Sequence, residues 1–208
     1  MNRLAILGAS GHGKVVADTA ESCGWQSVIF FDDAWPSLTR NGPWPVAGNT
    51  YDLIRKLKDY DGVIVAIGSN PIRLAKVHEL LSVGAPLISL LHPTSTVSRH
   101  VSIGKGSVVL AGAVINIDTR VGVGAIINTA CSIDHDCILA DGVHVSPGAR
   151  LAGGVKVAEL SWIGIGASIR QLINVGARVT VGAGAVVVHD IPDDVTAIGV
   201  PARALGSV

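Results

Sequence analysis

The sequence has few cysteines, few aromatic residues and no excess of either charge, and each shortage excludes a class of protein. Three cysteines among 208 residues are too few for a disulfide framework and indicate a reducing cytoplasm. Lysine plus arginine equals aspartate plus glutamate at 16 each, so the basic excess of a nucleic-acid-binding protein is missing. The apolar runs are too short for a membrane span or a secretory signal. We therefore expect a cytoplasmic protein with no nucleic-acid partner and no membrane span.

The chain is instead rich in small and branched apolar residues. Hydrophobic residues make up 49% of it, aromatic residues only 4%, and glycine occurs 25 times. A helical core of this size would normally contain more leucine and phenylalanine. The composition therefore favours β-structure with many tight corners.

The first 91 residues alternate between buried-strand and helix patterns. We predict strands over residues 3–9, 27–33, 62–68 and 86–91, helices over 13–24, 51–60 and 71–84, and a loop over 34–48. Asn70 followed by Pro71 is a typical helix start. This order predicts an α/β domain over residues 1–91 with a small Rossmann-like parallel sheet.

A different period begins at Val97. Every sixth residue from Val97 to Val187 is valine, isoleucine or leucine, which gives sixteen such positions in succession. Four residues after most of them is a small or β-branched side chain, as at Cys131 and Cys137. One aliphatic and one small inward residue per hexapeptide fit one wall of a triangular prism, with three walls in an 18-residue coil. We predict a parallel β-helix of about five coils and a C-terminal tail over residues 92–208.

Two histidines interrupt this apolar region, in the stretch SIDHDCILADGVHVSPGA. Neither His135 nor His144 falls on an inward position, which disfavours a core histidine and leaves a solvated corner as the non-functional alternative. Asp134 and Asp136 flank His135 and would orient its ring and raise its basicity. Nine residues are half a coil, which separates the two histidines by on the order of 15 Å in one chain. The spacing predicts an oligomer whose active sites lie between neighbouring prisms.

The α/β domain offers a ligand crevice of its own. Gly8, Gly11 and Gly13 in the first βα turn leave free amides at a helix N-terminus, which suits phosphate. Ligands of open α/β sheets bind at the carboxyl ends of the strands. Asp32 and Asp33 follow the second strand, where they either accept hydrogen bonds from a base or ribose or form a plain turn.

Five motifs together resemble one family. GASGHGKVV, FFDD, AIGSN, the NT…DHDC…H core and GVPAR are similar to the hexapeptide-repeat nucleotide-sugar acetyltransferases of the bacillosamine and perosamine N-acetyltransferase type. Sialic acid O-acetyltransferases are related to that group. GASGHG alone matches G-x-G-x-x-G poorly, because Ser10 replaces the second glycine. The resemblance covers nearly the whole chain and implies a left-handed β-helix and acetyl-CoA as co-substrate. The register of the two histidines predicts the homotrimer, in which three bundled prisms bring them together in the clefts between subunits.

The resemblance also implies roles for individual residues. His135 corresponds to the general base and Asp136 to its partner. The residues that correspond to the family's nucleotide-sugar contacts are Ser10, Gly11, His12, Asp32, Asp33, Gly68, Ser69 and Asn70. Asn128 and His144 correspond to residues near the acetyl group.

Small or flat corner residues predict the path of the coenzyme. Gly153 stacks one coil above His135, and Ala183 one coil above Ile165, which leaves a groove for the pantetheine arm. Arg170, Arg178 and Arg203 are either partners of coenzyme phosphates or solvated charges.

We therefore expect acetyl transfer from acetyl-CoA to the 4-amino group of a nucleotide-linked 4-amino-4,6-dideoxy sugar, with UDP favoured as the nucleotide. The amine attacks the thioester directly while His135 accepts a proton. The main alternatives are O-acetylation of sialic acid or another sugar and a non-catalytic sugar-binding scaffold. No zinc-type ligand spacing is present, which disfavours a carbonic anhydrase and predicts no metal. The chain has no room for the second half of a dinucleotide oxidoreductase.

Overall fold

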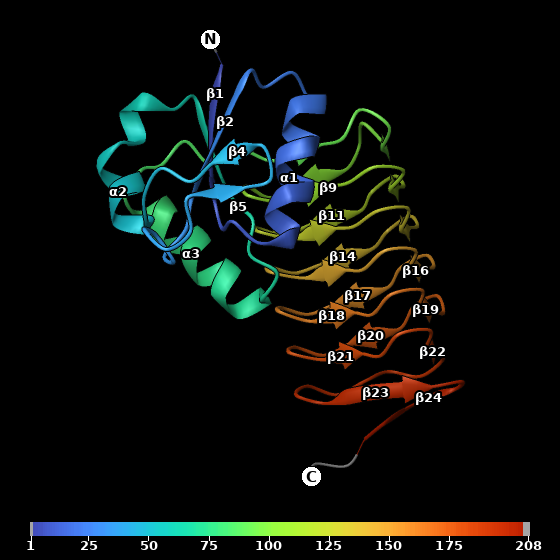
Figure 1. Ribbon diagram of the computed structural model, residues 1–208. Helices are drawn as coiled ribbons and strands as arrows, with labels where there is room; N and C mark the ends of the chain where they lie inside the picture. The colour runs from blue at the N-terminus through green and yellow to red at the C-terminus, as the bar shows by residue number, and fades with distance from the viewer. Residues whose placement is uncertain (1, 206–208) are drawn as a thin grey trace.

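The computed structural model describes residues 2–205 and contains a small α/β unit beside a β-solenoid (Figure 1). A parallel sheet in the order β2-β1-β5 forms the centre of the α/β unit. Its strands are β1 (Arg3–Leu7), β2 (Ser27–Phe31) and β5 (Gly62–Val65). The helices are α1 (Gly11–Ser22), α2 (Thr50–Arg55), a 3-10 turn (Leu57–Asp59) and α3 (Asn70–Ser82). The predicted parallel sheet with covering helices is confirmed.

Two predicted segments differ from the structure. The expected fourth strand, residues 86–91, is divided: Leu87 makes a single bridge to Val63, whereas β6 (Leu90–Leu91) pairs with the solenoid. This run is apolar throughout, so either sheet can bury it. The expected loop contains a hairpin of β3 (Arg40–Asn41) and β4 (Trp44–Pro45). Its turn uses the positive φ of Gly42, and Asn-Gly is a recognised hairpin signal.

The solenoid is a parallel β-helix with three walls. The first wall contains β6, β9 (Val108–Val109), β12 (Ile126–Ile127), β15 (His144–Val145), β18 (Trp162–Ile163), β21 (Thr180–Val181), β23 (Thr196–Gly199) and β24 (Ala202–Ala204). The second wall contains β7 (Thr96–Val97), β10 (Val114–Ile115), β13 (Ser132–Ile133), β16 (Arg150–Leu151), β19 (Ser168–Ile169) and β22 (Val186–Val187). The third wall contains β8 (Ser102–Ile103), β11 (Arg120–Val121), β14 (Ile138–Leu139), β17 (Lys156–Val157) and β20 (Asn174–Val175).

The hexapeptide period is confirmed at every unit. Each of the sixteen aliphatic positions is the second residue of a strand from β7 to β22, and partners are one coil apart, as Ile115 and Ile133 are. The aliphatic residues fill the core together with small residues that include Cys131 and Cys137, both fully buried. Because β6 and β23 extend the repeat at its two ends, the helix has about six coils rather than about five.

The α/β unit packs on the first wall. Outward residues Val108 and Ile126 are buried against α1 and the central sheet, in one cluster with Val16 and Phe30. The coils from β21 onward extend beyond the α/β unit (Figure 1). No helix among residues 2–205 is long and apolar enough to cross a membrane.

Helix α3 contacts the corner between the third and first walls. Leu74 and Val77 are close to the corner glycines Gly124 and Gly142. Leu160, the next residue in this corner column, adopts a positive φ of 61° where glycine is expected. Its side chain covers Gly142, so this departure from the repeat is part of the packing against α3.

Candidate active site

His135 lies at the corner between the second and third walls, beside an aspartate that binds its ring. Its Nδ1 is 2.7 Å from Oδ2 of Asp136, and this hydrogen bond is the main cause that raises the pKa of His135. Asp134 accepts hydrogen bonds from the His135 backbone N–H and from Asn116 Nδ2, each at 2.9 Å. The two aspartates therefore divide their tasks: Asp136 binds the ring and Asp134 fixes the corner.

The second ring nitrogen of His135, Nε2, has no hydrogen-bond partner among the described residues. A Cβ atom on Gly153 would lie 2.6 Å from both Nε2 and Cε1 of His135, so this glycine provides the room that the ring occupies. The sequence predicts Gly153 as a coenzyme-groove residue. The structure places it with His135, apart from the hollow described next.

A largely apolar hollow of about 410 Å³ lies on the first wall and its corner with the second wall. It is lined by His144, Ser146, Pro147, Trp162, Gly164, Ile165, Thr180, Val181, Gly182 and Ala183. Three of the predicted cofactor residues, His144, Ile165 and Ala183, thus share one surface. A fourth, Asn128, reaches it by a hydrogen bond to His144.

The bonding around His144 defines its tautomer. Asn128 Oδ1 accepts a hydrogen bond from the Thr129 backbone at 2.8 Å, so Asn128 presents its Nδ2 donor to His144 Nε2 at 3.1 Å. A neutral His144 must then carry its proton on Nδ1, which has no hydrogen-bond partner among the described residues. Burial is the main cause that lowers the pKa of His144 to about 3. The ring is therefore an uncharged donor at neutral pH.

His144 is a buried wall residue rather than a solvated corner residue, because the α/β unit covers this part of the first wall. Its side chain is 8% exposed. Trp162, one coil further along, stacks on its ring with centroids 5.1 Å apart and donates from Nε1 to Ser146 Oγ at 2.6 Å. Trp162 was not among the predicted site residues. Its signal is an aromatic residue directly above His144 in a chain with four tryptophans.

The glycines of the crevice serve two purposes. A Cβ on Gly13 would collide with the Gly8 carbonyl oxygen, and Gly8 itself has a φ of 111° with Ala66 close by. These two glycines are required by the packing of α1 on β1. A Cβ on Gly11 or Gly68 would instead meet nothing within 4 Å. The space beside Gly11 and Gly68 therefore remains open at the carboxyl ends of β1 and β5.

The polar residues predicted for the crevice are partly engaged by the chain itself. The Asp32 carboxylate accepts hydrogen bonds from the backbone of Ala9 and Ala34. Asp33 accepts from the Thr50 backbone and lies 3.7 Å from Lys76 Nζ. These contacts anchor both carboxylates at the turn after β2.

At the starts of the helices, exposure differs from residue to residue. Ser10 and Ser69 are exposed N-cap residues of α1 and α3 and make no side-chain capping bond. Asn70 is buried, and its Nδ2 donates to the backbone oxygens of Leu160 and Ser161. The amide of Asn70 thus joins α3 to the β-helix, and its contact with a ligand stays a prediction.

His12 places the N-terminus of α1 near His144. Burial, together with the charge of Arg73, lowers its pKa to about 4. His12 Nε2 has no hydrogen-bond partner within residues 2–205. His12 also contributes to the lowered pKa of His144, so the crevice and the hollow adjoin in one chain.

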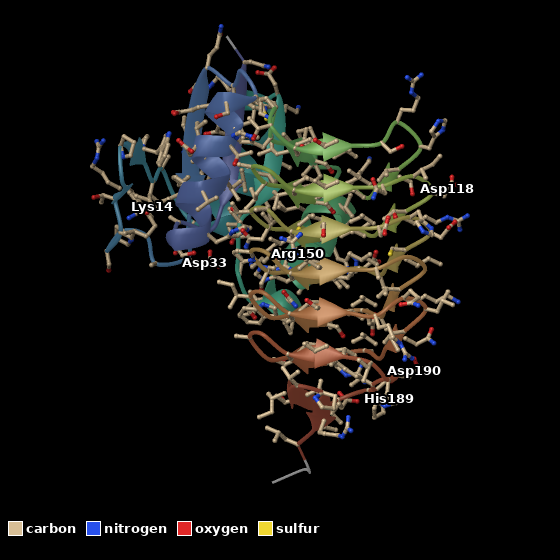
Figure 2. All side chains as sticks on the ribbon, turned by 90° about the vertical axis from the view of Figure 1, so that its right-hand side faces the viewer. Lys14, Asp33, Asp118, Arg150, His189 and Asp190 are labelled. Carbon is tan, nitrogen blue, oxygen red and sulfur yellow. The ribbon has the colours of Figure 1, made fainter. Side chains whose placement is uncertain are left out.

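His135 does not join this group. Its corner is opposite the first wall, and Figure 2 shows Asp118, His189 and Asp190 of the same corner on the edge away from Lys14 and Asp33 of the α/β unit. No cluster of three metal-ligating side chains is found across the described chain.

The three candidate phosphate partners differ. Arg178 forms ion pairs with Asp194 and, at 3.7 Å, with Glu159. Its role at the corner is therefore structural. Arg203 donates to its neighbouring backbone oxygen of Ala202, and Arg170 is exposed.

Known proteins share this architecture. A profile described as the PglD N-terminal domain matches residues 3–80. UDP-N-acetylbacillosamine N-acetyltransferase of Bacillus subtilis is 37% identical over 114 residues, which are 53% of this chain and 52% of that protein. The match thus spans about half the length of this curated relative.

Two solved structures match from end to end. The acetyltransferase domain of PglB from Neisseria gonorrhoeae, in complex with acetyl coenzyme A, is 44% identical with a TM-score of 0.93 and covers 99% of this chain and 100% of that chain. PerB from Caulobacter crescentus, in complex with CoA and GDP-perosamine, is 38% identical with a TM-score of 0.94. The match covers 99% of this chain and 98% of that chain. With this likeness and the repeat described above, the chain belongs to the hexapeptide-repeat nucleotide-sugar N-acetyltransferases, and its solenoid is a left-handed β-helix.

Proposed function

We propose that this protein transfers the acetyl group of acetyl-CoA to the amine of a nucleotide-linked 4-amino-4,6-dideoxy sugar. The observation that carries the proposal is the His135–Asp136 pair, in which Nδ1 is bonded to the carboxylate and Nε2 is free. A histidine that is held in this way and exposed at a corner has the form of a general base. The hydrogen bond to Asp136 raises the pKa of His135 and so increases its basicity.

The reaction requires no covalent enzyme intermediate. The sugar amine attacks the thioester carbonyl carbon, and His135 Nε2 accepts the proton that the amine loses. Asp136 stabilises the resulting imidazolium. The tetrahedral intermediate then collapses, the carbon–sulfur bond breaks, and the imidazolium returns its proton to the departing thiolate of CoA. The uncharged Nδ1–H of His144 is a suitable donor to the oxyanion.

The hollow on the first wall is the proposed seat of the pantetheine arm. Its lining is apolar, and Gly164 and Gly182 flatten the corner there. Ile165 and Ala183 are exposed to this surface, as a coenzyme groove requires. The gonococcal relative was solved with acetyl coenzyme A bound, which supports the same co-substrate here.

The crevice at the ends of β1 and β5 is the proposed nucleotide-sugar site. The amides at the start of α1 suit a diphosphate, and the open space at Gly11 and Gly68 lets a ligand approach the backbone. We propose UDP as the nucleotide, since the Bacillus subtilis relative is named for a UDP-linked sugar. GDP is the competing choice, since PerB was solved with GDP-perosamine.

The active site is proposed to form between subunits of a homotrimer. His135 lies at the corner opposite the wall that contains the hollow, so one chain does not bring base and thioester together. A second chain packed alongside supplies the missing half. Three free cysteines and the use of acetyl-CoA agree with a cytoplasmic enzyme.

The direct test is release of the coenzyme A thiol from acetyl-CoA with a panel of acceptors. UDP-, GDP- and dTDP-linked 4-amino sugars and free sialic acid are supplied to the native protein and to His135→Ala. We expect rapid release with one nucleotide sugar and a loss of about 10²-fold or more in the variant. Release with sialic acid alone would instead assign O-acetylation. Tight ligand binding with no release from any acceptor would leave a binding protein and overturn the proposal.

A further inference from the structure

Arg73 is the largest fully buried side chain of the described residues, and it is 1% exposed. All five of its N–H groups donate hydrogen bonds to uncharged oxygen atoms. Nε binds the Gly124 carbonyl at 2.7 Å, Nη1 binds those of Ile67 and Gly68 at 3.0 and 3.2 Å, and Nη2 binds Asn70 Oδ1 and the Gly142 carbonyl at 2.8 and 2.9 Å. No donor is left to contact a ligand directly.

The acceptors of Arg73 belong to two parts of the molecule. Ile67 and Gly68 follow β5 and border the crevice. Gly124 and Gly142 are equivalent corner residues of two successive coils. Asn70 extends the series, because it donates to the carbonyl of Leu160 on the next coil. A single guanidinium thus fixes the border of the crevice on the β-helix.

The charge of Arg73 has no counterion in the part of the chain that the structure describes. Among residues 2–205, no carboxylate forms an ion pair with it. Burial lowers the pKa of Arg73 to about 10, so the group stays protonated at neutral pH. A buried charge whose partners are all neutral exerts a field that water screens weakly.

The guanidinium lies close to His144, because Nη2 of Arg73 binds the carbonyl of Gly142, two residues earlier in the chain. Arg73 lowers the pKa of His12 on α1 and of His144 on the first wall, in each case second to burial. The other groups that contact the His144 ring, Asn128 and Trp162, are uncharged. Arg73 and burial therefore act in the same direction on both rings.

We propose that Arg73 is a positioning residue for the transfer reaction: its guanidinium sets the crevice at a fixed place on two coils, and its unpaired charge acts on His12 and His144. The role in catalysis rests on the proposed function. The two physical effects, on attachment and on ionisation, do not, and each is measurable without substrates. An uncharged His144 retains its free Nδ1–H as a donor, whereas a positively charged ring would lose the Asn128 bond at Nε2.

The test compares three variants of the full chain with the native protein. Arg73→Gln removes the charge and most of the bonds, whereas Arg73→Lys keeps the charge and loses most of the bonds. Leu74→Ala is the matched control, because it loosens the same contact with Gly124 and Gly142 and changes no charge. Histidine pKa values are followed by NMR titration of ¹⁵N-labelled imidazoles, and unfolding is followed in urea.

We expect native His144 and His12 to titrate well below 6.5, and both pKa values to rise by about one unit or more in Arg73→Gln. Arg73→Lys and Leu74→Ala should keep the low values, although both are less stable. A native His144 that titrates near 6.5 overturns the proposal without any variant, even if Arg73→Gln fails to fold. Equal pKa shifts in Arg73→Gln and Leu74→Ala also overturn it, since loosening alone would then explain them.

Activity separates this inference from the proposed function. With an active acceptor, Arg73→Lys should lower kcat/KM by about tenfold or more through misplacement of the crevice, with unchanged histidine pKa values. Arg73→Gln should lower kcat/KM to a similar extent and should in addition raise the pKa values of His12 and His144. If no acceptor is acetylated by the native protein, the proposed function fails, while the substrate-free titrations still decide whether the charge of Arg73 acts on the histidines.

Discussion

His135 depends on two neighbours with opposite properties. Oδ2 of Asp136 lies 2.7 Å from Nδ1 of the ring, and Gly153 leaves room for the ring because it has no side chain. Asp136 can reach the ring because it adopts a positive φ of 59°, which Asp tolerates better than most residues. The proposed base is therefore defined by a corner conformation as much as by sequence neighbours.

The pH dependence of kcat/KM tests the Asp136 contact. In the proposed mechanism, activity requires neutral His135 and falls as the pH drops through its pKa. Because the Asp136 hydrogen bond raises that pKa, Asp136→Asn should move the acid limb to lower pH and reduce the plateau by about tenfold. Asp118→Asn is the matched control, since Asp118 lies one coil earlier with a φ of 61° and does not bind His135. An unmoved limb in Asp136→Asn would show that the contact does not govern the base.

Gly153→Ala tests the space around the ring. The backbone of Gly153 has no positive φ, so alanine is compatible with the fold, but its Cβ would displace Nε2 of His135. We expect kcat to fall by about 10- to 100-fold with little change in unfolding. In a His135→Ala background the same substitution should cost nothing more. A further loss in that background would assign Gly153 another function, such as contact with the coenzyme.

Site residues that belong to a local sequence pattern were predictable, whereas residues defined by contacts with distant parts of the chain were not. The DHDC stretch contains both His135 and Asp136, and the period places Ile165 and Ala183 on one corner. Arg73 looks like an ordinary helix residue. Only its position on the same face as Leu74, Val77 and Leu80 gives a signal, because these neighbours are apolar and buried.

At the scale of elements, two glycines at the start of α1 have different tasks: one is needed for packing and the other for ligand binding. Gly11→Ala should not destabilise the protein, because its Cβ meets open space, but it should weaken nucleotide-sugar binding by about tenfold. Gly13→Ala is the contrasting variant: its Cβ collides with Gly8, so the free energy of unfolding should fall by about 2 kcal/mol. Urea unfolding and calorimetric binding measure the two effects. Equal affinity of native protein and Gly11→Ala would contradict the crevice assignment.

Helices and strands were predictable from the sequence wherever a segment had only one sheet with which to pair or pack. The strands β1, β2 and β5 and the helices α1 and α3 follow from apolar runs and helical periodicity. The segment 86–91 could not be assigned from its own residues, because it passes from one sheet to the other. Its division at Leu87 and Leu90 depends on Val63 and on β9, which are remote in sequence.

For the whole molecule, the period predicted sixteen strands but not the seat of the α/β unit. Outward positions of the first wall are unusually apolar at Val108 and Ile126, and this signal becomes clear only once the wall is known to be covered. The contact between the α/β unit and the first wall also buries His12 and His144. This contact therefore makes the free energy of unfolding depend on pH.

Stability should therefore fall between pH 6.5 and about 4.5. The pKa values of His12 and His144 are lowered to about 4 and 3, so in this range the unfolded chain binds protons that the folded protein does not. Each pH unit below 6.5 should cost about 1.4 kcal/mol for each histidine. The raised pKa of His135 gives a contribution to the pH dependence of stability with the opposite sign. Solvent screens this contribution because His135 is exposed. Carboxylates with lowered pKa values contribute to the loss of stability only at lower pH.

Urea unfolding at pH 7, 6 and 5 measures this slope. His144→Phe should remove about half of it, since one of the two buried neutral histidines is lost. His78→Gln, at an exposed position of α3, is the control and should leave it unchanged. A flat profile in the native protein would show that the two rings are not held neutral.

The most direct test of the central claim, that base and coenzyme hollow meet only between chains, is complementation in mixed oligomers. His135→Ala removes the base, and Ala183→Trp fills the hollow, so each variant alone should be inactive. Hetero-oligomers purified through two different tags should regain about a third of the native coenzyme A release, because one of the three interfaces in each mixed trimer then combines an intact His135 with an intact hollow. Hetero-oligomers that stay at background, although both variants bind their remaining ligand, would contradict the account and place the complete site within one chain.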